Sequence, residues 1–295
     1  MRTKYLVGII LLLNASFAFS QLNILSGVEG GSYNQVANDI NKISGNSHKI
    51  LLSKGSSYTF HNLMMKPQKY DVAFLQGDVM LVGKEQYEGV ENVKVLLSLG
   101  MEEIHLVTTK SSNINSLKDL SEKFIGIGTK EQGTSITAQV IHSLTGFNLY
   151  LVGIPFDDCF DALLSGKIDA FFFVGSAPVS KLNDLDDKYK NEFKLVPIKH
   201  QSLTKYYKKT VIKAGTYSWV TEDVETYGIN HVMATNIEKE TPERVEQLTK
   251  LLTAIKENIE KLQKEGHPVW KQVDFKAVCD NYEMHDVAKK VFGLK

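Results

Sequence analysis

The feature that most constrains the fold is a weak internal repeat of a nine-residue pattern. Residues 69–77 read Lys-Tyr-Asp-Val-Ala-Phe-Leu-Gln-Gly, and residues 167–175 read Lys-Ile-Asp-Ala-Phe-Phe-Phe-Val-Gly. In both copies a lysine stands two residues before an aspartate, and a glycine stands six residues after it. Two copies of one supersecondary unit predict two similar lobes.

A strand followed by a glycine turn precedes each copy of the repeat. The first turn contains Gly30, Gly31 and Ser32, and the second contains Gly133 and Thr134. Gly31 and Gly133 stand 102 residues apart, which is close to the separation between the two copies of the repeat. Each lobe is therefore predicted to carry a glycine loop at the carboxyl end of a strand, where open α/β sheets bind ligands.

Short apolar runs alternate with helical segments along the whole chain, which predicts an α/β fold. Several of the runs are continuously apolar, as expected for strands covered by helices on both faces of a sheet. The expected strands are 22–25, 49–52, 71–75, 93–97, 104–109, 124–127, 149–152, 168–174, 194–197 and 228–234. The expected helices are 33–43, 57–65, 135–144, 156–164 and 242–264.

Residues 1–20 have the pattern of a signal peptide. Arg2 and Lys4 precede an apolar run that is too short to cross a bilayer. Ala18 and Ser20 are small residues at the positions that favour cleavage before Gln21. No cysteine follows for lipid attachment, so we expect a periplasmic or secreted protein; a membrane anchor is the alternative.

Charge and cysteine content exclude several classes of partner. The chain has 34 basic and 34 acidic residues among 295, and this balance argues against nucleic acid, whose phosphates require a basic surface. Cys159 and Cys279 are the only cysteines. Cys159 falls on the apolar face of a predicted helix, so we expect two separate buried thiols rather than a disulfide.

The glycine loops are suited to binding an anion. A turn that opens a helix leaves backbone N–H groups unpaired, and the helix dipole adds positive potential there. Glycine lets a ligand approach the main chain, and Ser32, Thr134 and Ser135 add hydroxyl donors. The alternative is that both loops are ordinary strand–helix turns, but two loops at equivalent repeat positions favour binding.

Beyond the leader the only arginine is Arg244, in the polar C-terminal helix. A bidentate arginine–carboxylate clamp is therefore nearly excluded. We expect an anion to be held by main-chain amides, hydroxyl groups, Gln or Asn side chains, or lysine.

Other candidates follow strand ends, namely Ser56, Gln76, Asp78, Gly175 and Ser176. Asp78 has two interpretations, as the acceptor of a ligand ammonium or as the N-cap of a helix that begins at Val79. Tyr33 and Tyr217 are either walls of the site or ordinary packing residues.

The sequence has no pattern that requires catalysis. It has no Walker loop, and residues 126–131 depart from the dinucleotide fingerprint at the third glycine. No nucleophile elbow occurs, and the eight histidines show no pair at metal-ligand spacing. We therefore expect no catalytic residues, no metal and no cofactor, and interpret the chain as a binding protein and not an enzyme.

Taken together, the motifs resemble the TAXI family, the extracytoplasmic receptors of tripartite ATP-independent periplasmic (TRAP) transporters. The resemblance covers nearly the whole chain after residue 20. It is carried by Gly30–Tyr33, Leu75–Asp78, Gly128 with Gln132–Thr134, Leu163–Ala170, Gly175–Pro178, Ala214–Tyr217 and His267-Pro268. One departure is that the usual Gly-Ser-Gly-Thr reads Glu131-Gln132-Gly133-Thr134 here.

The resemblance implies a two-lobed type II periplasmic-binding-protein fold with the ligand cleft between the lobes. It also implies a small anionic ligand, such as glutamate, a 2-oxo acid or a dicarboxylate, and delivery to TRAP-type permease subunits. Transferred position by position, the ligand loops are Gly31, Ser32, Tyr33, Ser56, Gln76, Gln132, Gly133, Thr134, Gly175 and Ser176.

In such a fold the chain crosses between lobes twice. We expect lobe one to comprise residues 21–108 plus 214–295, and lobe two residues 109–213. A receptor that senses a ligand and reports to a signalling partner, without transport, is the alternative function. An enzyme on the same fold is a third interpretation, which no catalytic residues support.

Overall fold

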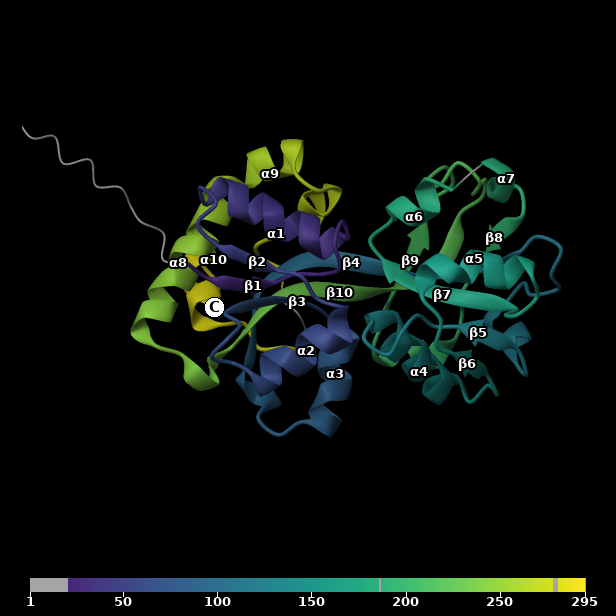
Figure 1. The fold of residues 1–295 in the computed structure, drawn as a ribbon, viewed down its shortest axis with the longest axis horizontal. Coiled ribbons are helices and arrows are strands. Elements are labelled where there is room, and N and C mark those ends of the chain that lie inside the picture. Colours follow the sequence, from purple (N-terminus) through teal and green to yellow (C-terminus); the bar gives the residue numbers. More distant parts are fainter. Residues whose placement is uncertain (1–20, 186, 278–280, 295) are drawn as a thin grey trace, which may run out of the picture.

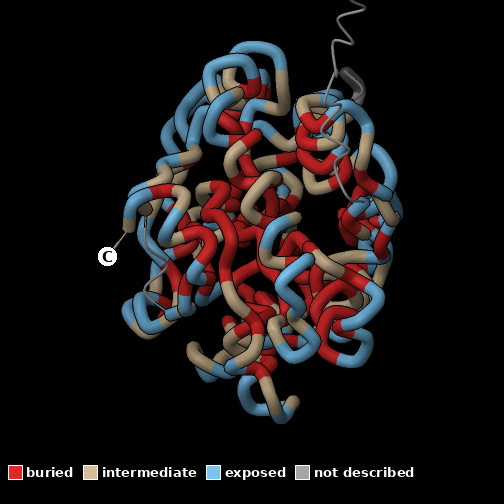
Figure 2. The backbone as a smooth tube through the Cα atoms, turned by 90° about the vertical axis from the view of Figure 1, so that its left-hand side faces the viewer, coloured by how far each residue is buried: buried red, intermediate tan, exposed pale blue. Residues whose placement is uncertain are grey.

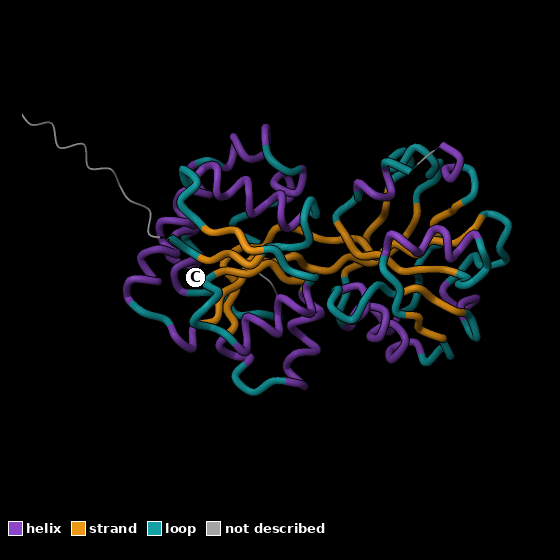
Figure 3. Tube along the Cα trace, viewed as in Figure 1, coloured by secondary structure: helices purple, strands orange, loops and turns teal. Residues whose placement is uncertain are grey.

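A computed structural model describes residues 21–185, 187–277 and 281–294. The predicted signal peptide and Cys279 lie outside the described residues. The chain forms two α/β lobes joined by one continuous sheet (Figure 1). Strands run as a central layer through both lobes, and helices cover both faces (Figure 3). The predicted two-lobed α/β fold is confirmed.

The strands are β1 Asn23–Leu25, β2 Lys49–Leu51, β3 Val72–Gln76, β4 Val93–Thr109, β5 Phe124–Gly126, β6 Tyr150–Val152, β7 Ala170–Gly175, β8 Phe193–Leu195, β9 Lys208–Ile212 and β10 Val224–Asn236. The α-helices are α1 Ser32–Ile43, α2 Ser56–Met65, α3 Gly77–Gln86, α4 Gly133–Thr145, α5 Phe156–Leu164, α6 Ser180–Asn183, α7 Asp187–Lys190, α8 Pro242–Glu257, α9 Ile259–Glu265 and α10 Asp286–Phe292. Short 3₁₀ turns lie at η1 Val90–Asn92, η2 Leu117–Leu120, η3 Gln201–Lys205, η4 Ile237–Lys239 and η5 Pro268–Gln272.

The sheet has the same arrangement on both sides of its centre. Its order is β2-β1-β3-β10-β4-β7-β5-β6. In lobe one β1 lies parallel between β2 and β3, and in lobe two β5 lies parallel between β6 and β7. The two copies of the sequence repeat therefore occupy equivalent positions, as the constant spacing predicts.

The aspartate of each repeat performs the same structural task. The Oδ2 atom of Asp71 accepts a hydrogen bond from the backbone N–H of Asn23 at 2.7 Å. The Oδ2 atom of Asp169 accepts one from the N–H of Phe124 at 2.9 Å. Each carboxylate ties the start of one strand to the start of its neighbour, which explains why the sequence carries the same residue type at both places.

Two long antiparallel strands, β4 and β10, connect the lobes. The sequence predicts two strands where β4 forms one, and this prediction is wrong. Gly100, with a φ of +104°, lets the strand bend midway, and β10 supplies pairing partners on both sides of the bend. β9, which pairs with the first part of β10, was also not predicted from the sequence.

The hydrophobic cores divide the chain differently from the expected lobe boundaries. The core of the first lobe draws on residues 22–99 and 232–292, and the cores of the second on 104–229. Tyr217 and Trp219 pack in the second lobe, beyond the expected boundary at residue 213. Buried segments fill the middle of the molecule, and exposed segments lie mostly around them (Figure 2). We propose lobe boundaries within 100–103 and 230–231.

The C-terminal helical region begins as predicted. The Oγ1 atom of Thr241 accepts from the N–H of Arg244 at 3.2 Å, and Pro242 occupies the first turn. The expected single helix is interrupted at Asn258, whose side chain donates to the carbonyl of Ala254 at 2.9 Å. This competing hydrogen bond accompanies the division into α8 and α9.

Arg244 is buried, although its helix looks polar in sequence. The side chain is only 5% exposed. One guanidinium nitrogen lies 2.7 Å from Asp71, and the group also donates to the carbonyls of Pro67 and Tyr70. The arginine therefore joins the loop before β3 to α8, and its guanidinium group is not available to a ligand.

We expect Arg244→Ala to lower the free energy of unfolding by about 3 kcal/mol, because removing one partner of a buried ion pair leaves the other polar groups unsatisfied. Chemical denaturation measures this. The matched control is Lys250→Ala on the same helix, whose partner Glu246 is largely exposed, and it should change stability by less than about 0.5 kcal/mol. Equal effects in both variants would contradict the prediction.

Within the part of the chain that the structure describes, no helix combines the length and the apolar character needed to cross a membrane.

Candidate functional site

A cavity of about 400 Å³ lies between the lobes, and most of the predicted site residues line it. Both glycine loops contribute, one from each lobe. Nine of the eleven predicted residues are brought together here: Gly31, Ser32, Tyr33, Ser56, Gln76, Gln132, Gly133, Thr134 and Gly175. Asp78 and Ser176 do not line it. The structure places these residues in one cleft, while their role in ligand binding stays a prediction.

The two glycine loops open helices at equivalent positions in the two lobes. The first follows β1 and leads into α1, and the second follows β5 and leads into α4. The first backbone N–H groups of a helix have no partner within it. Because both helices begin at the cavity, their N-terminal donors and positive dipole ends converge on one space. This is the arrangement expected of an anion site.

The lobes touch along one side of the cavity. The N–H of Tyr58 donates to the carbonyl of Glu131 at 3.1 Å, and the Ser57 hydroxyl donates to the carbonyl of Gln132 at 3.2 Å. These bonds join the start of α2 to the loop before α4. The α1 loop and the segment from Val179 to Lys181 line the opposite part of the same cavity.

Gly133 makes the tightest approach between the lobes. A Cβ atom at this position would lie 1.2 Å from the side-chain oxygen of Gln76 and 3.1 Å from the Cβ of Ser56. Gln76 itself is held in place, because its N–H donates to the Ser56 hydroxyl at 2.8 Å. A side chain at position 133 would therefore displace the Gln76 side chain from its present place, and the contact joins the α4 N-terminus to the end of β3.

Asp78 does not line the cleft cavity, and its interpretation as a helix N-cap is wrong, while its role as acceptor of a ligand ammonium stays a prediction. The helix begins at Gly77, so Asp78 is not its cap. The carboxylate is 2% exposed and lines a second hollow of about 450 Å³ between α3 and α4. Its Oδ2 atom accepts from Thr137 at 2.6 Å and from Tyr207 at 3.1 Å, both in the other lobe. Burial raises its pKa to about 6.

Ser176 and Tyr217 serve packing. The Ser176 hydroxyl is buried and donates to the carbonyl of Met101 at 3.2 Å. Tyr217 is fully buried, its hydroxyl lies 2.8 Å from Nε2 of His105, and it accepts from the N–H of Val179 at 3.0 Å. Of the two interpretations of Tyr217, the packing one is correct, because the cavity does not reach its ring.

Glu102, a carboxylate in the cavity wall, was not among the site residues predicted from the sequence. Glu102 belongs to β4 and is only 4% exposed. The Tyr33 hydroxyl donates to its Oε2 atom at 3.0 Å. Burial raises the pKa of this carboxyl to about 8, partly offset by hydrogen bonds from Tyr33 and Gln76. The signal available in the sequence was the acidic pair Glu102-Glu103 inside an otherwise apolar strand.

His231 lies behind Glu102 and does not neutralise it. Its Nδ1 atom is 4.0 Å from Oε1 of Glu102, and its ring stacks on Tyr33 with centroids 4.2 Å apart. The imidazole is fully buried, and burial lowers its pKa to about 3. It is therefore neutral at pH 7, and the contact is not an ion pair.

Part of the lobe-two wall of the cavity is apolar. Phe156 from α5, Phe173 from β7 and Val179 line it, and the two phenylalanine rings lie 4.2 Å apart between centroids. Within β7, Phe171 and Phe172 are buried, whereas Phe173 lines the cavity. The cleft combines main-chain donors, one buried carboxylate and an apolar wall.

Residues 24–292 match the NMT1-like family. The chain belongs to the NMT1-like family. No narrower family follows from this match, and the TAXI resemblance remains a hypothesis.

Solved structures with the two-lobed binding-protein fold resemble this NMT1-like chain at low identity. The substrate-binding protein of an amino acid ABC transporter has a TM-score of 0.51 at 13% identity, with 84% of this chain and 100% of that chain covered. AbpA of Streptococcus pneumoniae, bound to L-arginine, has a TM-score of 0.51 at 15% identity, with 86% and 95% covered. XAC2383 of Xanthomonas citri, bound to chloride ion, has a TM-score of 0.54 at 9% identity, with 92% and 95% covered. These likenesses establish the fold.

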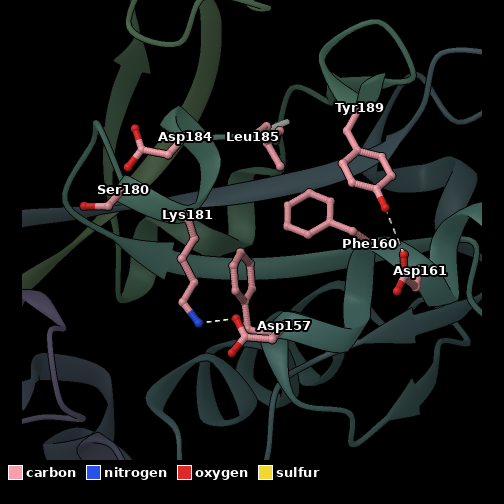
Figure 4. Close-up of a pocket in the computed structure, with 9 residues that line it drawn as sticks. Asp157, Phe160, Asp161, Ser180, Lys181, Asp184, Leu185 and Tyr189 are labelled. Atoms are coloured by element: carbon pink, nitrogen blue, oxygen red, sulfur yellow. Dashed lines mark hydrogen bonds and ion pairs between the residues drawn. The ribbon is translucent and has the colours of Figure 1, made fainter. Parts of the chain in front are cut away.

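A third hollow, also of about 450 Å³, adjoins the cleft of the NMT1-like chain, between α5 and α6 (Figure 4). Lys181 lies in the wall of both hollows, and its ammonium pairs with the carboxylate of Asp157. Figure 4 shows the lysine side chain extended toward Asp157, and the Tyr189 hydroxyl directed at Asp161. The ammonium group of Lys181 is therefore paired with Asp157 at the rim of the cleft.

Cys159 is buried on α5, as predicted, and burial raises its thiol pKa to about 12. Its thiol is free. Over residues 21–185, 187–277 and 281–294, no three His, Cys, Asp or Glu side chains are grouped to hold a metal ion.

Proposed function

We propose that this NMT1-like chain is an extracytoplasmic solute-binding receptor that captures a small carboxylate between its lobes. The observation that carries the proposal is the convergence of two glycine-loop helix N-termini, one per lobe, on a single interlobe cavity of about 400 Å³. Main-chain amides held by rigid helices bind an anion without any arginine, and Arg244 is occupied elsewhere.

Capture would proceed by lobe closure around the ligand. A carboxylate first binds the donors of one lobe, and the second set completes its shell when the lobes approach. Closure removes water from the site, which strengthens each amide–carboxylate hydrogen bond. The hinge would lie in β4 and β10, the two strands that pass between the lobes.

We further propose that the receptor works outside the cytoplasm with a TRAP-type permease. The leader pattern of residues 1–20 and the TAXI-like motifs support this, as do the binding proteins of membrane transporters among the structures that share the fold. Since the cavity is small and lined by residues from both lobes, a low-molecular-weight solute is the cargo it suits.

A thermal-shift panel of amino acids, 2-oxo acids and dicarboxylates tests the proposal. A cognate carboxylate at about a thousand-fold over its Kd should stabilise the protein by roughly 4 kcal/mol, or about 10 °C in melting temperature. Uncharged sugars and polyamines of similar size serve as control ligands and should give no shift. If no carboxylate in the panel shifts the melting temperature, the proposed function is wrong.

A further inference from the structure

Glu102 is the one acidic side chain that is both buried and in the wall of the cleft cavity, among the residues described. Its Oε2 atom accepts from the Tyr33 hydroxyl at 3.0 Å, and the side chain is 4% exposed. Glu29, the other carboxylate of the wall, is exposed at the rim. A carboxyl group in such a place faces whatever occupies the cavity.

No described cationic side chain balances Glu102. Its nearest basic group is His231, 4.0 Å away and neutral. Lys181 pairs with Asp157, and Lys54 is exposed at the rim. Buried carboxylates are ordinarily paired with a cation or kept protonated. A ligand cation is therefore the partner this carboxyl group lacks.

Hydrogen-bond donors and an acceptor also lie at different places in the cavity wall. The α1 and α4 N-termini present backbone donors from the two lobes, and Glu102 presents an acceptor from the hinge strand. A ligand with a carboxylate and an ammonium matches both. A ligand with carboxylates alone would bring a negative charge to Glu102 and would offer this carboxyl group no cation.

We propose that Glu102 accepts the ammonium group of the ligand, and that the site selects small zwitterionic amino acids over the corresponding hydroxy and oxo acids. This rests on the proposed function and narrows its ligand class. The apolar wall formed by Phe156, Phe173 and Val179 would contact the side chain of the amino acid.

Binding of an ammonium group would change the protonation state of Glu102. In the empty protein, burial raises the pKa of Glu102 to about 8, so the carboxyl group is mostly protonated at pH 7. When an ammonium group binds, the carboxylate form is stabilised and the proton leaves to the solvent. Binding of the zwitterion should therefore release close to one proton per ligand at pH 7.

Isothermal titration calorimetry on the mature chain tests this with matched pairs: L-alanine and L-lactate, L-glutamate and 2-oxoglutarate, L-phenylalanine and L-phenyllactate. In at least one pair the amino acid should bind at least about tenfold more tightly than its partner, a difference of roughly 1.4 kcal/mol. Titration at pH 7 in buffers of different ionisation enthalpy measures the proton released.

The variants are Glu102→Gln and, as matched control, Glu103→Gln. Glu103 is the next residue of β4, does not line the cavity, and accepts from the N–H of Ala177. Glu102→Gln should lose the preference and the proton release, whereas Glu103→Gln should keep both. Because proton release is measured on the unaltered protein, the test stands even if Glu102→Gln folds poorly.

The outcomes separate the two proposals. If hydroxy or oxo acids bind as tightly as the amino acids, without proton release, Glu102 does not accept an ammonium, while the carboxylate receptor stands. If a preference for amino acids persists in Glu102→Gln, another group reads the ammonium and the assignment is overturned. If no panel member binds at all, the proposed function fails together with this inference.

Discussion

Gly133→Asp is expected to fold normally and to lose ligand affinity by at least about 100-fold, roughly 3 kcal/mol. Two effects produce the loss. Any Cβ at this position overlaps the side-chain oxygen of Gln76, so the Gln76 side chain must leave the place that it occupies between the lobes. The added carboxylate also occupies the α4 N-terminus, where the ligand anion is proposed to bind.

Folding should survive because Gly133 faces the other lobe and not the core of its own. An aspartate in the first turn of α4 is favourable for the helix itself. The matched control is Gly153→Asp, also in lobe two, where a Cβ would meet only the carbonyl oxygen of Gly128 at an ordinary 3.8 Å.

Affinity is measured by calorimetry with the strongest carboxylate of the panel, and lobe closure by small-angle X-ray scattering with and without it. The control should bind and contract like the unaltered protein. Ligand binding of unaltered strength in Gly133→Asp would remove this loop from the site.

Glu102→Gln is expected to stabilise the empty protein at alkaline pH and to leave its stability nearly unchanged at pH 5. The carboxyl group has a folded-state pKa of about 8, against an ordinary value of 4.5. The folded state therefore binds more protons than the unfolded state between these values, and stability falls as pH rises through that window. Above pH 8 the full cost of the buried charge is present.

No positive charge near Glu102 assists its ionisation. Hydrogen bonds from Tyr33 and Gln76 lower its pKa, but burial raises it by more, His231 is neutral, and the carboxyl groups of Asp78 and Glu103 raise the pKa further when ionised. Glutamine keeps an acceptor oxygen for Tyr33 but cannot ionise, so the pH-dependent loss disappears.

Thermal melts from pH 5 to pH 9 measure the effect. The melting temperature of Glu102→Gln should exceed that of the unaltered protein by about 5 °C or more at pH 9, and the difference should shrink toward pH 5. Glu260→Gln, at an exposed position, should follow the unaltered protein throughout. A difference that is constant over the range would show that Glu102 is not buried as a protonated acid.

The two predictions test one connected set of contacts. Gly133 of lobe two lies against Gln76 of lobe one, Gln76 is hydrogen-bonded to Glu102 of the hinge strand, and Tyr33 at the start of α1 donates to the same carboxyl group. This set spans both lobes, so lobe closure and the protonation of Glu102 are expected to influence each other.

Local patterns in the sequence were sufficient for the two-lobed α/β architecture and for most elements. The repeat places Asp71 and Asp169 at the same structural task, and the glycine loops open α1 and α4. These features depend on neighbours close in the chain: strand periodicity, helix capping and glycine turns. The convergence of both loops on one cavity followed from the repeat, because equivalent units in a sheet of this order bring their loops to the same cleft.

Other features were decided only by the tertiary structure. β4 runs as one strand because β10 pairs with it on both sides of Gly100, an interaction 130 residues away in sequence. Arg244 is buried because Asp71 and the loop before β3 lie beneath α8. No local pattern reports such distant partners.

The same distinction between local pattern and tertiary structure applies to the candidate site. The presence of the glycine loops in the cleft could be predicted because unpaired amides at a helix start are a property of the backbone. Asp78 was misplaced because its position relative to the cleft depends on how α3 packs against α4. Glu102 was missed because its significance lies in burial without a cation, and burial is a consequence of all the elements that surround it.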